Sequence, residues 1–192
     1  MDTRERLLQA AAQEFALHGP KGTRIREIVA RSGVNERMIY HHFGSKEGLY
    51  KAVLEHEFTG STDVWAQTLK QAAGLEPYEG LQLAFRAMFD LLHARPLLVA
   101  LASQEAVGGF GVRPKVPTDG ISAELRGLHE RGVAQGVFRA DVDFVVFYAT
   151  MVSSLVAVPG MGRHFTGLAD RDMTQVRDQV VALVLDGLTG ER

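Results

Sequence analysis

Cysteine is absent from the 192-residue sequence, and long apolar runs are absent too. Without cysteine there is no disulfide framework, no thiol nucleophile, and no thiolate site for zinc or an iron–sulfur cluster. The longest nearly uncharged stretch, residues 144–159, is shorter than the ~20 residues that a membrane-spanning helix needs. The N-terminus carries Asp2, Arg4, Glu5 and Arg6 and lacks the apolar core of a signal peptide. We therefore expect a cytoplasmic protein with no membrane partner.

Charge is distributed unevenly along a chain of otherwise ordinary globular composition, with 46% hydrophobic and 23% charged residues. Residues 1–51 hold nine Lys and Arg against six Asp and Glu, whereas residues 52–192 hold twelve against seventeen. A small basic segment joined to a larger acidic one favours contact between the N-terminal segment and a polyanion. The alternative is ordinary solvated surface charge.

Helical periodicity dominates the N-terminal segment. Leu7, Ala11 and Phe15 recur at four-residue spacing, in a predicted helix that begins after Asp2 and ends at Gly19-Pro20. Three short elements follow. We expect a helix over 24–31 with Thr23 as its cap, a turn at Ser32-Gly33, a helix from Asn35 to about His42, and a fourth helix beginning at Lys46.

Longer helices are predicted beyond Gly74. Apolar stripes at three- and four-residue spacing cover residues 81–92, 97–107, 121–128, 142–156 and 176–188, and Asp141 is the expected cap of the fourth. No sustained alternating pattern occurs, so the fold class is all-α: a three-helix head over residues 1–50 and a body of five or six helices over residues 51–192. Residues 108–120 contain six Gly or Pro and form a connection long enough to serve as an entrance flap, although a segment without function is the alternative.

Two short helices separated by Ser32-Gly33-Val34-Asn35 make a helix-turn-helix arrangement, in which the first helix braces the second against the major groove. The strings Gly22-Thr23-Arg24-Ile25-Arg26-Glu27-Ile28-Val29, Ser32-Gly33-Val34 and Ile39-Tyr40-His41-His42-Phe43-Gly44-Ser45-Lys46-Glu47-Gly48-Leu49 resemble the N-terminal signature of TetR-type transcriptional repressors. The resemblance covers residues 3–52, about a quarter of the chain. The rest is similar in length and helical pattern.

The resemblance implies a set of DNA contacts. Tyr40 and His41 match positions that contact the DNA backbone, and Lys46 stands at a helix N-terminus, where a phosphate is favoured. Within the recognition helix, Glu36 can accept from cytosine and Arg37 can pair with guanine. The predicted DNA-binding residues are Thr23, Arg24, Arg26, Asn35, Glu36, Arg37, Met38, Tyr40, His41 and Lys46.

Three of these residues also have a structural alternative. Glu36 and Arg37 can form a solvated surface pair, and Tyr40 can pack within the head. His42 and Phe43 are interpreted as core of the head, and Gly33 as the turn residue that needs a positive φ.

Catalytic and metal-binding patterns are missing. His41 and His42 are adjacent and project to different sides of a helix, and His56-Glu57 lacks the second histidine of a zincin motif. The sequence contains no Gly-x-Ser-x-Gly elbow and no phosphate-cradling loop. We predict no enzyme activity, no metal and no cofactor. An architectural or nucleoid DNA-binding protein without an effector is the alternative, although a more basic chain is expected for it.

The body is predicted to hold a mainly apolar pocket for a small hydrophobic or aromatic effector. The candidate ligand-binding residues are Trp65, Phe85, Met88, Phe89, His93, Gln104, Phe147, Tyr148 and Met151. Each aromatic residue or methionine is alternatively plain core, His93 a helix cap, and Gln104 part of a solvated face.

Homodimerisation is predicted through the last two helices. Residues 142–158 are apolar around nearly their full circumference, and Val176, Val180, Val184 and Leu188 add a second stripe. Two such helices from each subunit form a four-helix interface, which predicts a palindromic operator. The alternative places this helix at the centre of the monomer core. The function expected overall is a repressor that binds operator DNA as a dimer and is released by a small molecule.

Overall fold

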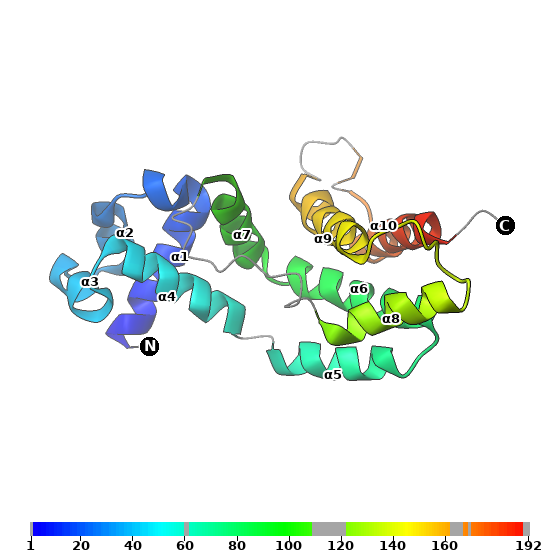
Figure 1. Ribbon diagram of the computed structural model, residues 1–192. Coiled ribbons are helices and arrows are strands. Elements are labelled where there is room, and N and C mark those ends of the chain that lie inside the picture. Colours follow the sequence, from blue (N-terminus) through cyan, green and yellow to red (C-terminus); the bar gives the residue numbers. More distant parts are fainter. Residues whose placement is uncertain (1, 60–61, 109–121, 162–166, 169, 190–192) are drawn as a thin grey trace. The chain divides into compact units, whose positions relative to one another are not determined.

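The computed structural model describes residues 2–59, 62–108, 122–161, 167–168 and 170–189. These residues form ten α-helices, and within them no strand occurs beyond an isolated bridge between Phe138 and Thr189, which confirms the all-α prediction (Figure 1). The chain divides into two compact units, one of Met1–Gly60 with Arg95–Lys115 and one of Ser61–Ala94 with Val116–Arg192. The predicted flap beyond Gly108, Ile121 and residues 162–166 lie outside the described residues.

The described part of the first unit contains five helices: α1 (Thr3–Gly22), α2 (Ile25–Ser32), α3 (Glu36–Phe43), α4 (Lys46–Thr59) and α7 (Pro96–Gly108). α1 packs against each of the other four (Figure 1). Its buried face supplies Leu7, Leu8 and Phe15 to a core that Ile39 of α3 and Leu101 of α7 complete. The predicted boundary after residue 50 therefore falls inside α4, and the head includes a helix from the middle of the sequence.

Capping side chains and glycines set the ends of the short helices. Asp2 and Glu5 form a reciprocal capping box at the start of α1. Asn35 accepts from the Arg37 amide at the start of α3, as predicted. Gly33, at φ 64°, ends α2, which confirms the turn assigned to it. α1 breaks at Gly19 (φ 68°), the predicted position, and the element then continues to Gly22.

Two predicted caps are wrong. Thr23 is buried, and its hydroxyl lies within hydrogen-bond distance of the carbonyls of Glu14 and Gly19 instead of capping α2. α9 (Phe144–Met161) is capped by Asp143, whose carboxylate accepts from two amides of the first turn, while Asp141 pairs with Arg139.

The second unit contains α5 (Thr62–Ala73), α6 (Pro77–His93), α8 (Ala123–Ala134), α9 and α10 (Met173–Leu188). α6 is its central helix, since it packs against α5, α8, α9 and α10 (Figure 1). The core of the second unit holds Phe85 and Phe89 of α6 and Phe147 and Met151 of α9. Among the described residues, no helix is both long enough and apolar enough to cross a bilayer.

Candidate nucleic-acid interface

α3 presents polar side chains to solvent while one apolar residue holds it in place. Ile39 is fully buried in the core of the first unit, and Met38 is half-buried against the same core. Glu36 and Arg37 are exposed, and so is Tyr40, whose side chain is 50% accessible. The helix therefore offers three predicted DNA-binding side chains to a ligand, and Tyr40 is not packed within the head.

Lys46 lies in the first turn of α4, and the N-terminus of a helix favours an anion. Its ammonium donates to the carbonyl of Lys21, with 3.4 Å between Nζ and the oxygen. Partial burial lowers the pKa of Lys46, and the nearby Glu27 carboxylate opposes that shift. The ammonium is thus held beside the junction of α1 and α2, next to the start of the bracing helix.

The N-terminal end of α2 exposes two arginines. Arg24 and Arg26 are both accessible, and the Arg24 amide donates to the Glu27 carboxylate. Thr23 is withdrawn from the predicted DNA contacts, because its side chain is 2% exposed and its hydroxyl is used inside the unit. Asn35 is exposed, but its side-chain oxygen caps α3.

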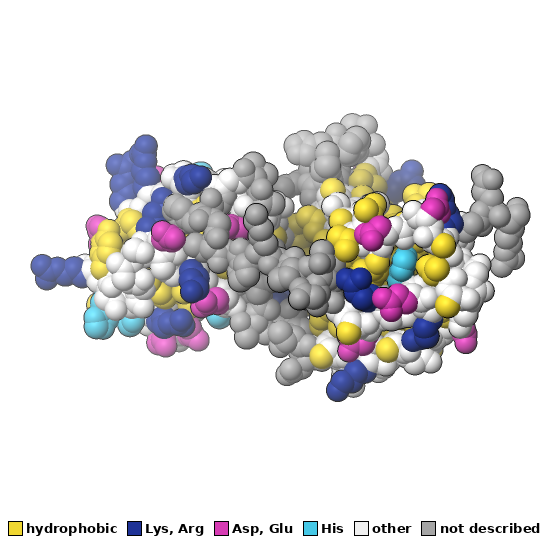
Figure 2. Space-filling model, in the orientation of Figure 1, with side chains coloured by type: hydrophobic (Ala, Val, Ile, Leu, Met, Phe, Trp, Pro, Cys, Tyr) yellow, Lys and Arg dark blue, Asp and Glu magenta, His cyan; other side chains and the backbone are white. Residues whose placement is uncertain are grey.

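The C-terminal end of α3 carries adjacent aromatic rings. His41 and His42 are exposed, with ring centroids 5.1 Å apart, so the interpretation of His42 as core is wrong. Phe43 is half-buried, and the guanidinium of Arg4 lies over its ring at 5.6 Å from the centroid. Figure 2 shows Lys and Arg side chains projecting from several sides of the first unit and His side chains at one end of it.

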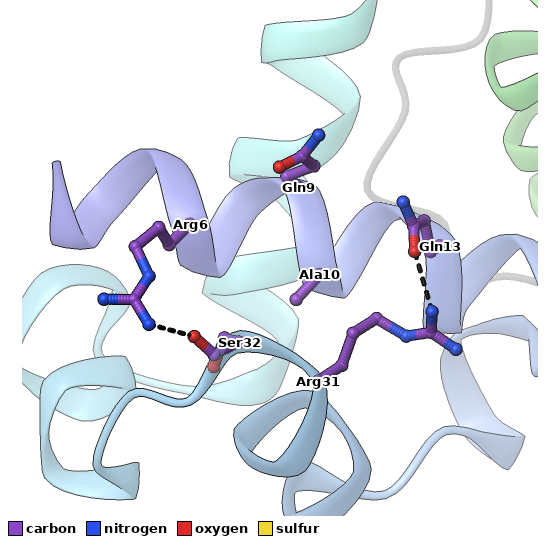
Figure 3. Close-up of a pocket in the computed structure, with 6 residues that line it drawn as sticks. All are labelled: Arg6, Gln9, Ala10, Gln13, Arg31 and Ser32. Atoms are coloured by element: carbon purple, nitrogen blue, oxygen red, sulfur yellow. Dashed lines mark hydrogen bonds between the residues drawn. The ribbon is translucent and has the colours of Figure 1, made fainter. Parts of the chain in front are cut away.

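A polar hollow of about 270 Å³ lies between α1 and α2, and sequence analysis did not identify it (Figure 3). Arg6, Gln9 and Gln13 line it from α1, and Arg31 and Ser32 line it from α2. Arg6 donates to the Ser32 carbonyl at 2.6 Å, and Arg31 donates to Gln13 at 2.8 Å. Both bonds join residues that lie far apart in the sequence, so no local pattern marks them.

The predicted effector residues divide between the two units. Eight of them lie in the second unit, where Phe85 stacks edge-on to Phe147 with 5.6 Å between centroids. His93 is exposed and stacks on Phe89 at 6.0 Å. Together with Trp65, Met88 and Tyr148, which are half-buried, and Met151, which is fully buried, these residues are called the aromatic cluster below.

Gln104 is the exception. It belongs to α7 in the first unit, and its amide donates to the Ala16 carbonyl at 3.5 Å. Its side-chain oxygen lies 2.8 Å from the position that a Cβ on Gly19 would take. Gln104 therefore lies in a different compact unit from the other eight candidates, and its side chain packs against the break in α1.

Within the described part of the chain, no group of three or more His, Asp or Glu side chains gathers into a metal-binding arrangement.

Known proteins match both parts of the chain. The family model for bacterial regulatory proteins of the tetR family matches residues 7–53, and the model for the tetracyclin repressor-like C-terminal domain matches residues 77–184. The chain belongs to the TetR family. It is similar to the transcriptional repressor NicS of Pseudomonas putida, at 32% identity over 84% of this chain and 77% of that one. It is also similar to the repressor KstR2 of Mycolicibacterium smegmatis, at 31% identity over 97% and 90% of the two chains.

A solved structure of this fold extends the comparison. The ketosteroid transcriptional regulator KstR2 of Mycobacterium tuberculosis superimposes with a TM-score of 0.71 at 24% identity, covering 99% of this chain and 96% of that one. In the chain described here, the match to the C-terminal family model includes α7. The packing of α7, however, assigns this helix to the unit that holds the helix-turn-helix. The boundary between sequence domains thus differs from the boundary between compact units.

Proposed function

We propose that this TetR-family protein is a cytoplasmic repressor that binds a palindromic operator as a homodimer and is released by a small hydrophobic or aromatic effector. The observation that carries the proposal is the exposed polar face of α3, with Glu36 and Arg37 on a helix anchored by the buried Ile39. The named relatives NicS and KstR2 are transcriptional repressors, which supports the same function.

Base recognition is assigned to α3 and phosphate binding to the surrounding residues. Arg37 suits a bidentate contact with guanine, and Glu36 suits the amino group of cytosine. Lys46 supplies a cation at a helix N-terminus, while Tyr40 and His41 are exposed near the C-terminal end of α3. Arg24 and Arg26 extend the basic surface along α2.

A second copy of the chain is the proposed occupant of an apolar groove between α9 and α10. The groove has a volume of about 310 Å³ and exposes Val146 and Leu183, whose side chains are 61% and 75% accessible. A two-fold interface would cover both residues in each subunit. Two heads related by this axis suit a palindromic operator with half-sites one helical turn apart. The groove is lined by Val142, Val146, Phe147, Thr150, Leu183, Val184, Gly187 and Leu188.

The effector is proposed to bind at the aromatic cluster of the second unit. Phe85, Phe89 and Phe147 provide apolar rings, and Tyr148 adds a hydroxyl on a half-buried side chain. KstR2 of Mycobacterium tuberculosis, which shares the fold, is a ketosteroid transcriptional regulator, and this supports a hydrophobic class of ligand.

The proposed path from effector to DNA runs through α7. Only Ala94 and Arg95 separate the end of α6 from the start of α7. Leu101 of α7 is fully buried in the core of the first unit. The buried Tyr50 of α4 interacts with Glu105 of α7, and burial together with this carboxylate raises the pKa of Tyr50. A 100-fold loss of DNA affinity transmitted along this connection requires a coupling of ~2.7 kcal/mol.

Two substitutions in the head test the DNA-binding part of the proposal. Lys46→Ala should weaken binding to every duplex and reduce the slope of log K against log salt by about one, as expected for one lost phosphate contact. Arg37→Ala should cost ~1–3 kcal/mol at one base pair and relax discrimination there. Both are measured by fluorescence anisotropy on a duplex that the wild-type chain enriches from a random library.

The outcomes separate the candidate functions. Unchanged operator affinity in both variants would refute the assignment of the head. A wild-type chain that enriches no sequence would favour the architectural alternative. Retained operator affinity in the presence of every hydrophobic compound screened would contradict release by an effector while leaving the DNA-binding assignment in place.

A further inference from the structure

α1 holds the C-terminal end of the bracing helix α2 through three side-chain contacts, which Figure 3 shows in part. The Arg6 guanidinium donates to the Ser32 carbonyl, with 2.6 Å between Nη2 and the oxygen. The Arg31 guanidinium pairs with Glu14 at 2.6 Å and donates to Gln13 at 2.8 Å. Each bond joins residues 17 or more positions apart, so the contacts fix one helix against the other.

The bond from Arg6 reaches the turn between α2 and α3 directly. Within the turn, the Gly33 amide donates to the Val29 carbonyl, and the Val34 amide donates to the Ser32 hydroxyl. The Ser32 carbonyl is one of the last carbonyls of α2, which have no partner within the helix. Arg6 of α1 supplies a hydrogen-bond donor to this carbonyl. Its Nη2 lies 3.1 Å from the position that a Cβ on Gly33 would take.

The other end of α2 is held by α1 as well. The Thr23 hydroxyl lies within hydrogen-bond distance of the carbonyl oxygens of Glu14 and Gly19, at 2.9 and 2.8 Å. The Glu14 side chain is only 6% exposed, and it accepts from Arg31 near the opposite end of the same helix. α1 therefore holds both the residue that leads into α2 and the C-terminal turn of α2, and the residues that hold them include a buried carboxylate.

α3 follows α2 after a short turn. Only Gly33, Val34 and Asn35 separate α2 from α3. A hydrogen bond from a side chain to a base edge tolerates a few tenths of an ångström before it weakens. We propose that Arg6 is a positioning residue for operator specificity: through the Ser32 carbonyl it fixes the turn that aims Glu36 and Arg37, without contacting DNA itself. This inference rests on the proposed sequence-specific DNA binding.

The experiment compares two duplexes, the one that the wild-type chain enriches from a random library and a scrambled duplex of the same composition. Arg6→Met should lower the ratio of the two affinities about tenfold, because operator binding weakens while scrambled binding and its salt slope stay unchanged. Tenfold corresponds to about 1.4 kcal/mol, the size of one charge-assisted hydrogen bond. Arg6→Lys should recover about threefold of the loss, because an ammonium also donates to a carbonyl. Gln9→Ala, in the same hollow, is the matched control and should leave both affinities unchanged.

Other results would overturn the inference. Equal weakening on both duplexes, with a salt slope reduced by about one, would make Arg6 a phosphate contact. An unchanged ratio in a folded Arg6→Met variant would remove its positioning role. If circular dichroism shows that Arg6→Met is unfolded, Arg6→Lys carries the test, and an unchanged ratio there would also refute the inference. A wild-type chain without sequence preference would instead be a failure of the proposed function.

Discussion

Leu183→Asp is expected to convert a dimer into a monomer. Leu183 lies on α10 at the edge of the α9–α10 groove, and its side chain is 75% exposed in the single chain. Full burial of a leucine side chain contributes ~2 kcal/mol, so covering the exposed three quarters contributes ~1.5 kcal/mol in each subunit. Two-fold symmetry doubles the loss to ~3 kcal/mol, or about 150-fold in the dimer Kd. Burying two aspartates adds a desolvation penalty in the same direction.

Sedimentation velocity over a range of concentrations measures the effect. We expect the wild-type chain to sediment at twice 21.0 kDa and Leu183→Asp at the monomer mass. Leu17→Asp is the matched control, since Leu17 is a 65% exposed leucine on α1 of the first unit. A Leu183→Asp variant that remains a dimer at every concentration tested, or equal dissociation of both variants, would refute an interface at this groove.

Two further predictions concern stability. Gly132→Ala should lower the melting temperature, because the added Cβ would lie 2.0 Å from a ring carbon of Phe138. Gly127→Ala on the same helix is the control: its Cβ would meet nothing within 4 Å, so the substitution should be neutral or stabilising. Equal melting temperatures of the two variants would contradict the clash. Burial lowers the pKa of His129, so the unfolded chain binds a proton that the folded chain does not, and stability should fall as the pH drops below ~6.5. Urea unfolding at about pH 8 and about pH 5.5 checks this, since His129→Phe should show a smaller pH dependence; an unchanged dependence would refute it.

Helix ends in the head were predictable wherever one local signal decides them. Gly33 and Gly44 each adopt a positive φ at a helix end, which glycine tolerates best, and Asn35 caps α3. Thr23 and Asp141 carry equally good capping side chains, yet the structure uses the Thr23 hydroxyl inside the unit and pairs Asp141 with arginine. Tertiary partners decided those two cases, and the sequence contains no local sign of them.

Core membership was less predictable than helix position. The leucine stripe of α7 was identified, but periodicity does not tell which of two cores a helix joins. Leu101 and Gln104 were consequently predicted to lie in the body, whereas the structure places both residues in the head. Arg6 was missed for a related reason, since its partner Ser32 lies 26 residues away and exposed arginines are common on any surface.

The integration of α7 into the first unit affects how this protein can be divided or recombined. A fragment that ends after α4 contains every helix of the helix-turn-helix but loses Leu101 from its core and the Glu105 partner of the buried Tyr50. A chimera that joins this DNA-binding head to the effector domain of another regulator therefore has to exchange the chain at three places: before α5, at the α6–α7 junction and after α7. The DNA-binding part is built from two separate segments of the chain. Cutting the chain at a single position therefore cannot transfer it intact to another protein.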